Sequence, residues 1–213
     1  MPNYTEDDLE HLEESAETAR PGHQSQALAF VAGILERNAI AYGVMGGMNF
    51  YLRGSGRTTG DVDIAVDNPP RMEALLSIFN SHRRVAQIFV DIRGQLVQLD
   101  LKPKGSEGHL IPRDIASSVE RMSFTVTQIS FQCDMLAIGP LVAAKLKSHY
   151  NRETQADYQD LVFIVSSSSE TSTSKLDIRK VLETWSHTVK PGKSPRWAKV
   201  WASVCITMDC SYG

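Results

Sequence analysis

The sequence predicts an α/β fold, in which a small mixed sheet of four or five strands is flanked by helices and followed by a mainly helical C-terminal part. Between residues 25 and 103, short apolar runs with strand spacing alternate with segments of helical spacing. Gly-rich turns separate these segments. From Pro140 onward the apolar spacing is typical of helices.

Composition limits the class of protein. The chain has 213 residues, which suits one domain with an appendage or two small domains. With 42% hydrophobic and 22% charged residues it can bury an ordinary core. It has no run of 18 apolar residues and begins with an acidic segment, which predicts a cytoplasmic protein without a membrane partner. A net charge of −3 argues against a globally basic nucleic-acid binder.

The first elements follow from capping and apolar spacing. Thr5-Glu-Asp-Asp8 is a capping box that opens an acidic helix to about Ala19, which Pro21-Gly22 ends. Gly46-Gly47 then form a turn that connects a buried strand to a helix, and a Gly-rich loop leads to the next strand. The expected elements, in order, are a helix over 25–38, a strand over 41–45, a helix over 48–53, a loop over 54–60 and a strand over 61–66.

The later elements follow in the same way. Pro69-Pro70 opens a helix, since proline is tolerated in a first turn, and Arg93-Gly94 makes a tight hairpin turn. The expected elements are a helix to Asn80, strands over 86–92 and 95–102, a helix over 113–121, one or two strands over 124–134, and helices over 141–150, 156–165 and 175–187.

Asp61-Val-Asp63 carries the strongest functional signal. Side chains two apart on a strand point to the same face, about 6.6 Å apart. The run Asp61 to Val66 alternates acid and aliphatic, so one face is charged and the other packs into the core. Two like charges on a half-buried strand are costly unless a cation neutralises them. Mg²⁺ prefers carboxylate oxygen and often recruits substrate phosphates, so it is the expected cation.

Gly46-Gly47, Asp61-Val-Asp63 and the later Gln98-Leu-Asp100 together resemble the core of the nucleotidyltransferases of the DNA polymerase β superfamily, over residues 40 to 103. Arg57-Thr-Thr-Gly-Asp61 is similar to the lead-in of abortive-infection nucleotidyltransferase toxins and small antibiotic nucleotidyltransferases. A weaker likeness to the helical segment of those branches extends to Lys145, Arg152 and Asp157 to Asp160.

The resemblance implies a metal site made by Asp61, Asp63 and Asp100, which would hold two Mg²⁺ ions and catalyse transfer. It implies an NTP site that uses the backbone of Gly46 and Gly47 and the side chains of Arg57, Thr59, Lys145 and Arg152. Met48 departs from the family, where Ser or Thr is common, so a phosphate grip by backbone alone is expected and Met48→Ser should be tolerated.

Several of these residues also have ordinary structural interpretations. Lys145 on an apolar helix is as well explained by a snorkelling surface lysine, and Arg152, Asp157 and Asp160 by helix-surface charges. Basic residues beyond the Asp61 strand, Lys102 among them, are expected to be dispersed on a solvated face.

The resemblance predicts an NTP-dependent enzyme that transfers a nucleoside monophosphate to a hydroxyl, with ATP among the candidate donors. A small-molecule acceptor ranks ahead of an RNA end such as a tRNA 3′ terminus. The alternatives are an adenylate-forming ligase and a non-catalytic nucleotide-binding relative. The expected parts are an acidic N-terminal helix (1–22), a nucleotidyltransferase core (23–135), a helical C-terminal part (136–190) with a Ser/Thr-rich linker (166–174), and a tail (191–213).

Overall fold

The protein is described from a computed structural model that covers residues 5–67, 72–82, 85–86, 88–105, 108–167 and 180. Its chain divides into two compact units. The first comprises Met1–Ser106 with Ile111–Leu136, and the second comprises Glu107–Leu110 with Ala137–Gly213.

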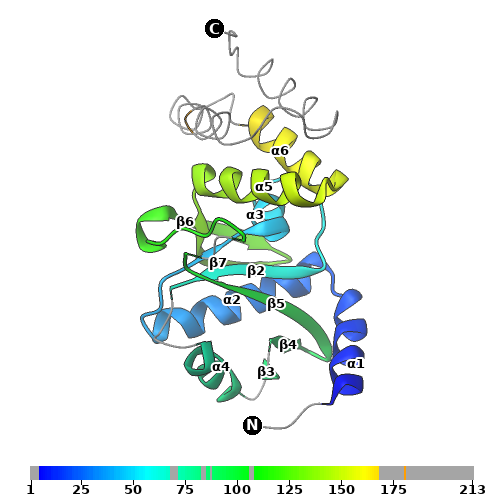
Figure 1. Cartoon of the computed structure of the whole chain (residues 1–213). Helices are drawn as coiled ribbons and strands as arrows, with labels where there is room; N and C mark the ends of the chain where they lie inside the picture. The colour runs from blue at the N-terminus through cyan, green and yellow to red at the C-terminus, as the bar shows by residue number, and fades with distance from the viewer. Residues whose placement is uncertain are drawn as a thin grey trace, which may run out of the picture. The chain divides into compact units, whose positions relative to one another are not determined.

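A seven-stranded mixed sheet forms the centre of the first unit, in the order β3-β4-β5-β2-β1-β7-β6 (Figure 1). Two neighbouring pairs, β1 with β7 and β2 with β5, run parallel, and the other neighbours run antiparallel. The α/β prediction is confirmed, but the expected four or five strands are too few. The strands are β1 (Tyr42–Val44), β2 (Asp61–Val66), β3 (Val85–Ala86), β4 (Phe89–Ile92), β5 (Gln95–Pro103), β6 (Val119–Val126) and β7 (Ile129–Leu136).

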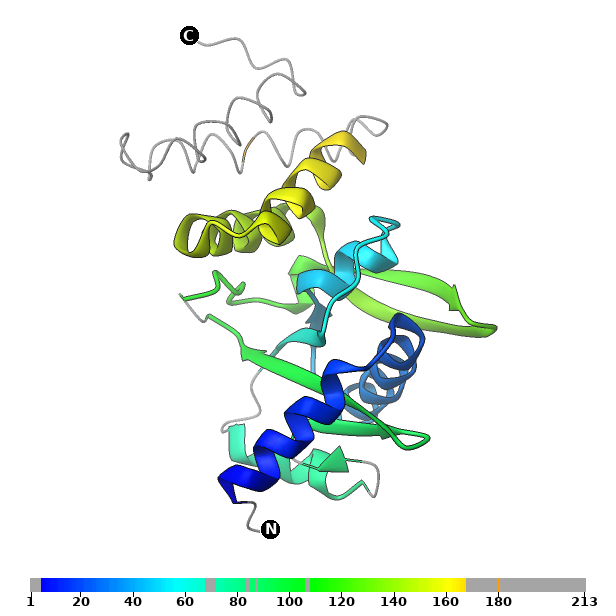
Figure 2. The ribbon, with the colours of Figure 1, turned by 90° about the vertical axis from the view of Figure 1, so that its right-hand side faces the viewer.

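Helix α2 (Pro21–Arg37) packs its buried residues against β2, β4, β5 and β7. The expectation that Pro21-Gly22 ends the first helix and that the second begins at Ser25 is wrong. Pro21 instead opens α2, because a proline at the first helical position lacks only an N–H that would have no partner there. The acidic helix α1 (Glu6–Glu17) has the predicted capping box and contacts β5, which it crosses in Figure 2.

Helix α3 (Gly46–Leu52) contacts β2, and α4 (Met72–Asn80) contacts β3. Asn49, which is fully buried, fixes α3 to the strand ends. Its side-chain amide donates hydrogen bonds to the carbonyl oxygens of Val44 (2.7 Å) and Leu136 (3.2 Å). Tyr42 and Phe50 are core residues.

Strand β2 divides its side chains between two environments. Val62 and Ile64 are fully buried in the core cluster, whereas Asp61 and Asp63 alternate with them and are partly exposed. This is the acid-and-aliphatic alternation that the sequence predicts for a strand with one charged face.

Residues 113–121 do not form the expected helix. They contain a short 3-10 turn, η1 (Ala116–Ser118), and the start of β6. Among the described strands, β6 pairs with β7 alone and lies at the edge of the sheet. None of its side chains is fully buried, and its first residues, Val119-Glu120-Arg121, do not alternate apolar with polar, so the start of the strand carries no strand pattern.

In the second unit, α5 (Ile138–Arg152) and α6 (Gln155–Ser167) pack together, where helices over 141–150 and 156–165 were expected. None of the described helices is long and apolar enough to span a membrane. Several predictions fall outside the described residues: the start of a helix at Pro69-Pro70, residues 168–174 of the linker, nearly all of the helix over 175–187, and the tail over 191–213.

Candidate active site

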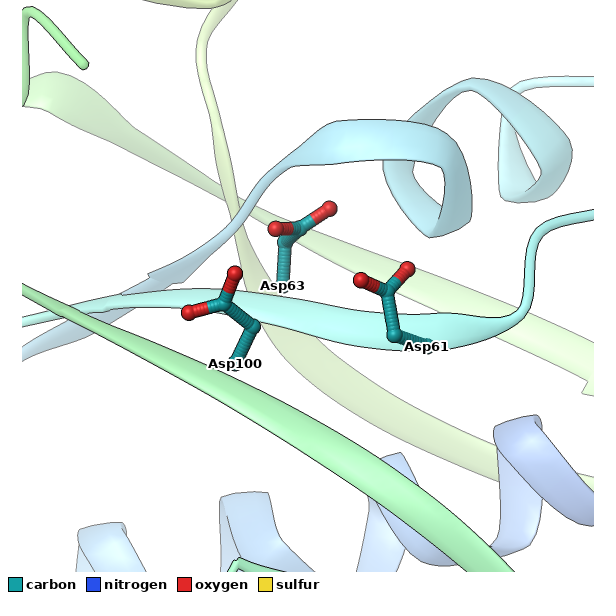
Figure 3. Close-up of side chains that lie close together, drawn as sticks. All are labelled: Asp61, Asp63 and Asp100. Carbon is teal, nitrogen blue, oxygen red and sulfur yellow. The ribbon is translucent and has the colours of Figure 1, made fainter. Parts of the chain in front are cut away.

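Asp61, Asp63 and Asp100 come together on neighbouring parallel strands. In the register of β2 and β5, Asp63 lies directly opposite Asp100. One carboxylate oxygen from each of the three residues lies within 4.8 Å of the others. All three side chains project to the side of the sheet where β1 turns into α3 (Figure 3). Three converging carboxylates are a donor set that suits a hard divalent cation such as Mg²⁺.

Lys102 lies within this group of acids. Its Nζ donates a hydrogen bond of 2.7 Å to Asp63 Oδ1 and a second, short one to Asp100 Oδ2. The lysine is 7% exposed. The expectation that Lys102 belongs to a solvated face is therefore wrong. The strand period explains why, since residues 100 and 102 lie on the same face of β5.

The electrostatic environment of Asp63 favours binding of positive charge. Burial raises the pKa of the Asp63 carboxyl above its usual range, and the like charge of Asp61 raises it further. Lys102 works in the opposite direction and does not fully offset these effects. The ionised Asp63 carboxylate is therefore destabilised in this site, and a bound cation would relieve that destabilisation.

Gly46 and Gly47 open α3 directly beside the acids. Gly46 has a φ of +58°, in the left-handed region that glycine tolerates. Gly47 lies on the other side of the turn, where a Cβ would come within 2.6 Å of Thr59 Cβ and 2.8 Å of Arg57 Nη2. The backbone is thus closely approached by Asp63 on one side and by the Arg57–Thr59 loop on the other.

Met48 does not face this loop. It is fully buried in the hydrophobic core. A serine at position 48 would therefore not present its hydroxyl to a nucleotide, and the expectation that Met48→Ser is tolerated loses its basis.

The loop before β2 is anchored from both directions. The Thr59 hydroxyl donates a hydrogen bond of 2.9 Å to Asp61 Oδ1. The Thr59 carbonyl oxygen accepts a hydrogen bond of 2.5 Å from the side-chain amide of Gln24, which is fully buried in α2. Helix α2 thereby fixes the residue that orients the Asp61 carboxylate.

Lys145 and Arg152 belong to the second unit, where they bind carboxylates. Lys145 Nζ lies 2.9 Å from both Asp157 Oδ1 and Asp160 Oδ2. Arg152 donates hydrogen bonds of 3.2 Å to both oxygens of Asp157. Lys145, Asp157 and Asp160 are buried, so the interpretations of Lys145 as a snorkelling lysine and of the two acids as helix-surface charges are wrong. A role for Lys145 or Arg152 in nucleotide binding stays a prediction.

Sequence reasoning missed two residues of this site. The signal for Lys102 was available, because a lysine two residues after a metal-binding aspartate on a strand shares its face. Gln24 gave no comparable signal, because its contact with Thr59 joins residues 35 apart in the chain.

Comparison with known proteins supports the fold. No protein-family model matches the chain, and no curated protein matches it. Among solved structures, the crystal structure of an antigenic nucleotidyltransferase-like protein from Paracoccidioides brasiliensis is similar over 89% of this chain and 93% of its own, with 15% identity and a TM-score of 0.50.

Two structures of the antibiotic-resistance factor ANT(2'')-Ia are also similar. The solution structure covers 77% of this chain and 95% of its own, with 10% identity and a TM-score of 0.47. The crystal structure in complex with adenylyl-2''-tobramycin covers 87% and 98%, with 13% identity and a TM-score of 0.37. The chain therefore has a nucleotidyltransferase-like fold, as its sequence predicts, on the strength of the first of these likenesses.

Proposed function

We propose that this chain is a Mg²⁺-dependent nucleotidyltransferase, which transfers a nucleoside monophosphate from an NTP to a hydroxyl acceptor and releases pyrophosphate. One observation carries the proposal: Asp61, Asp63 and Asp100 converge within 4.8 Å in a nucleotidyltransferase-like fold. The acids come from two paired strands, so their spacing follows from the sheet itself.

The metal ions would be held by Asp61, Asp63 and Asp100, whose hard oxygen donors fit Mg²⁺. When bound, two such ions neutralise the charge that develops on the attacking and leaving oxygens in an in-line displacement. The chain's own contribution is to hold the carboxylates in register and correctly oriented. The hydrogen bond from Thr59 to Asp61 and the strand pairing of Asp63 with Asp100 both support that role.

The triphosphate would lie against the turn at Gly46 and Gly47. The first N–H groups of a helix have no partner within the helix and attract anions. The lack of side chains at Gly46 and Gly47 makes room for Asp63 and for the Arg57–Thr59 loop, and the Arg57 guanidinium beside Gly47 adds positive charge. Thr59 then acts mainly through Asp61, rather than as a phosphate ligand.

In the transfer step, the acceptor hydroxyl oxygen forms a bond to the α-phosphorus, and the bond from that phosphorus to the pyrophosphate oxygen breaks. The hydroxyl loses its proton in this step. Asp100 is suited to assist this loss, because its side chain is 49% exposed, compared with 16% for Asp63. An acceptor arriving from solvent would therefore meet Asp100 first.

We propose a small hydroxylated molecule as the acceptor, because the chain is of modest size and has a net charge of −3. A long polyanion such as RNA is bound mainly through positive charge. An NTP donor would place the reaction in the cytoplasm. Transfer to an RNA end, activation of a carboxylate for ligation, and nucleotide binding without transfer are the other outcomes of the test.

The test is to incubate the full chain with each labelled NTP and Mg²⁺, together with either total RNA or a metabolite extract, and to find which fraction gains the label. Asp61→Asn and Asp63→Asn each remove a charge from the metal site and preserve side-chain shape. Both should lose labelling by orders of magnitude while circular dichroism shows a folded protein. Asp7→Asn, on an exposed position of α1, is the matched control and should label like the wild type. Labelling at the wild-type level by either site variant would rule out the metal assignment.

A further inference from the structure

Lys102 stands where a bound cation would stand. Its ammonium is bonded to oxygens of both Asp63 and Asp100, two of the three acids assigned to the metal. The side chain is 9% exposed, so this is a largely buried charge and not a surface ion pair. Strand β5 makes the arrangement unavoidable, because residue 102 follows residue 100 on the same face.

The charges explain why a lysine is present. Three carboxylates of like charge within 4.8 Å repel one another when nothing lies between them. Hydrogen bonds between an ammonium and carboxylates are among the strong ones in proteins, and removing one partner of a buried pair leaves an uncompensated charge. Lys102 therefore lowers the repulsion that the acids would have on their own.

The same contacts compete with a metal ion. A divalent cation bound by Asp63 and Asp100 would use carboxylate oxygens and would repel a positive charge at bonding distance from them. The oxygen atoms Asp63 Oδ1 and Asp100 Oδ2 cannot serve both cations equally well. An ion that uses these two oxygens would break or loosen two charge-assisted hydrogen bonds.

We propose that Lys102 is a positioning residue that acts as the internal counter-ion of the metal-free site. It holds Asp63 and Asp100 in their paired register, and a divalent cation displaces its ammonium from them. The proposal rests on the proposed function, since it requires that Asp61, Asp63 and Asp100 bind a metal. The metal affinity of the site is then set by the exchange of the Lys102 ammonium for the divalent cation.

The variant that tests this is Lys102→Met, which removes the charge and keeps most of the apolar stem. Lys104→Met is the matched control. Lys104 lies just beyond the same strand, but its Nζ pairs with Asp67, outside the three acids, and its side chain is 41% exposed. Lys102→Arg keeps the positive charge and should keep the competition.

The experiment measures binding of Mn²⁺ alone to the full chain, without nucleotide, from the electron paramagnetic resonance signal of free Mn²⁺. We expect Lys102→Met to bind Mn²⁺ at least about tenfold more tightly than the wild type, a difference of about 1.4 kcal/mol. Lys104→Met and Lys102→Arg should stay within about threefold of the wild type. Equal or weaker binding by folded Lys102→Met would overturn the counter-ion role while leaving the metal site in place.

Thermal unfolding provides a second measurement if Lys102→Met is poorly folded without metal. Removing the ammonium should lower the melting temperature, and saturating Mn²⁺ should raise it by more in Lys102→Met than in the wild type, because binding to the folded state alone stabilises it. An equal or smaller rise would overturn the proposal. If neither the wild type nor Lys102→Met binds Mn²⁺, the metal assignment itself fails, and that result differs from failure of the counter-ion role alone.

Discussion

Gly46 lies so close to Asp63 that a Cβ on the glycine would stand 1.7 Å from Asp63 Oδ2. The turn between β1 and α3 therefore packs directly against the Asp63 carboxylate of β2. A side chain at position 46 and the Asp63 carboxylate cannot occupy their places together. Position 46 must therefore be glycine to leave room for the Asp63 carboxylate, in addition to any contact of the turn with phosphate.

Gly46→Ala should displace Asp63 and weaken Mn²⁺ binding by at least about tenfold, roughly 1.4 kcal/mol. The positive φ adds a backbone cost of about 1–2 kcal/mol to the free energy of folding. Gly56→Ala separates the two effects, because Gly56 has a φ of +70° but nothing within 4 Å of an added Cβ. Urea unfolding should show a loss of stability in both variants, whereas Mn²⁺ titration should show a loss of binding only in Gly46→Ala. Equal Mn²⁺ affinities would contradict the clash with Asp63.

Gly47→Val should raise the NTP dissociation constant by at least about tenfold, or 1.4 kcal/mol. The reason is the packing of the loop, because the added side chain would meet Thr59 and Arg57. Backbone strain does not contribute, since the positive φ of this turn belongs to Gly46 and not to Gly47. Gly60→Val, with nothing within 4 Å of an added Cβ, is the control. Calorimetric titration with a non-hydrolysable NTP analogue measures both. Unchanged affinity in folded Gly47→Val would remove this turn from the nucleotide site.

Met48→Ser should destabilise the protein by about 2–5 kcal/mol, the range for truncating a large buried side chain. Met48 is fully buried, and the shorter serine would leave a cavity together with a buried hydroxyl. Met48→Leu nearly conserves the volume and should cost less than about 1.5 kcal/mol. Urea unfolding compares the three proteins. A serine variant as stable as the wild type would show that Met48 is not a core residue in solution.

Thr59→Val removes the hydroxyl that bonds Asp61 and leaves the side-chain shape nearly unchanged. We expect Mn²⁺ affinity to fall by at least about tenfold, in keeping with the roughly 1.5–3 kcal/mol that a hydrogen bond to a charged group contributes. Thr58→Val, at an exposed neighbouring position, should bind like the wild type. If the two valine variants bind Mn²⁺ equally, Thr59 does not orient Asp61.

The parts of the fold that were predictable from sequence depend on neighbours along the chain. The alternation in β2 placed Asp61 and Asp63 on one face, and Arg93-Gly94 placed the β4–β5 hairpin. The strands expected over 124–134 include the end of β6 and most of β7, but the start of β6 was assigned to a helix over 113–121.

The parts of the site that sequence could not supply depend on pairing between distant segments. The strand period places Lys102 on the face of Asp100, but its contact with Asp63, 39 residues away, depends on the β2–β5 register, which no local pattern encodes. Gln24 reaches Thr59 only because α2 packs beneath the sheet that carries the loop. Packing of α6 against α5 likewise buries Lys145 in an ion pair with Asp157, where its own helix alone suggested a surface position.

Stability of the second unit should depend on pH through Asp157. Burial acts to raise the pKa of this carboxyl, but Lys145, Thr154 and Arg152 together outweigh burial and hold the pKa below its ordinary value of 3.8. A carboxyl with a lowered pKa in the folded state contributes stability that is fully present above the unfolded-state pKa. That stability is lost as the pH falls through the lower, folded-state pKa.

Asp157→Asn removes this contribution and leaves Lys145 short of one of its two carboxylates. Near neutral pH we expect the variant to lose about 3 kcal/mol of stability in α5 and α6, as for a broken buried ion pair. The difference should shrink between about pH 5 and pH 2, as the wild-type carboxyl takes up its proton. Native-state hydrogen exchange of the α5 and α6 amides measures it at each pH, with Asp7→Asn on α1 as a control that should leave these amides unchanged. A difference that stays constant down to pH 2 would mean that Asp157 stabilises the helices through its shape and hydrogen bonds, and not through its charge.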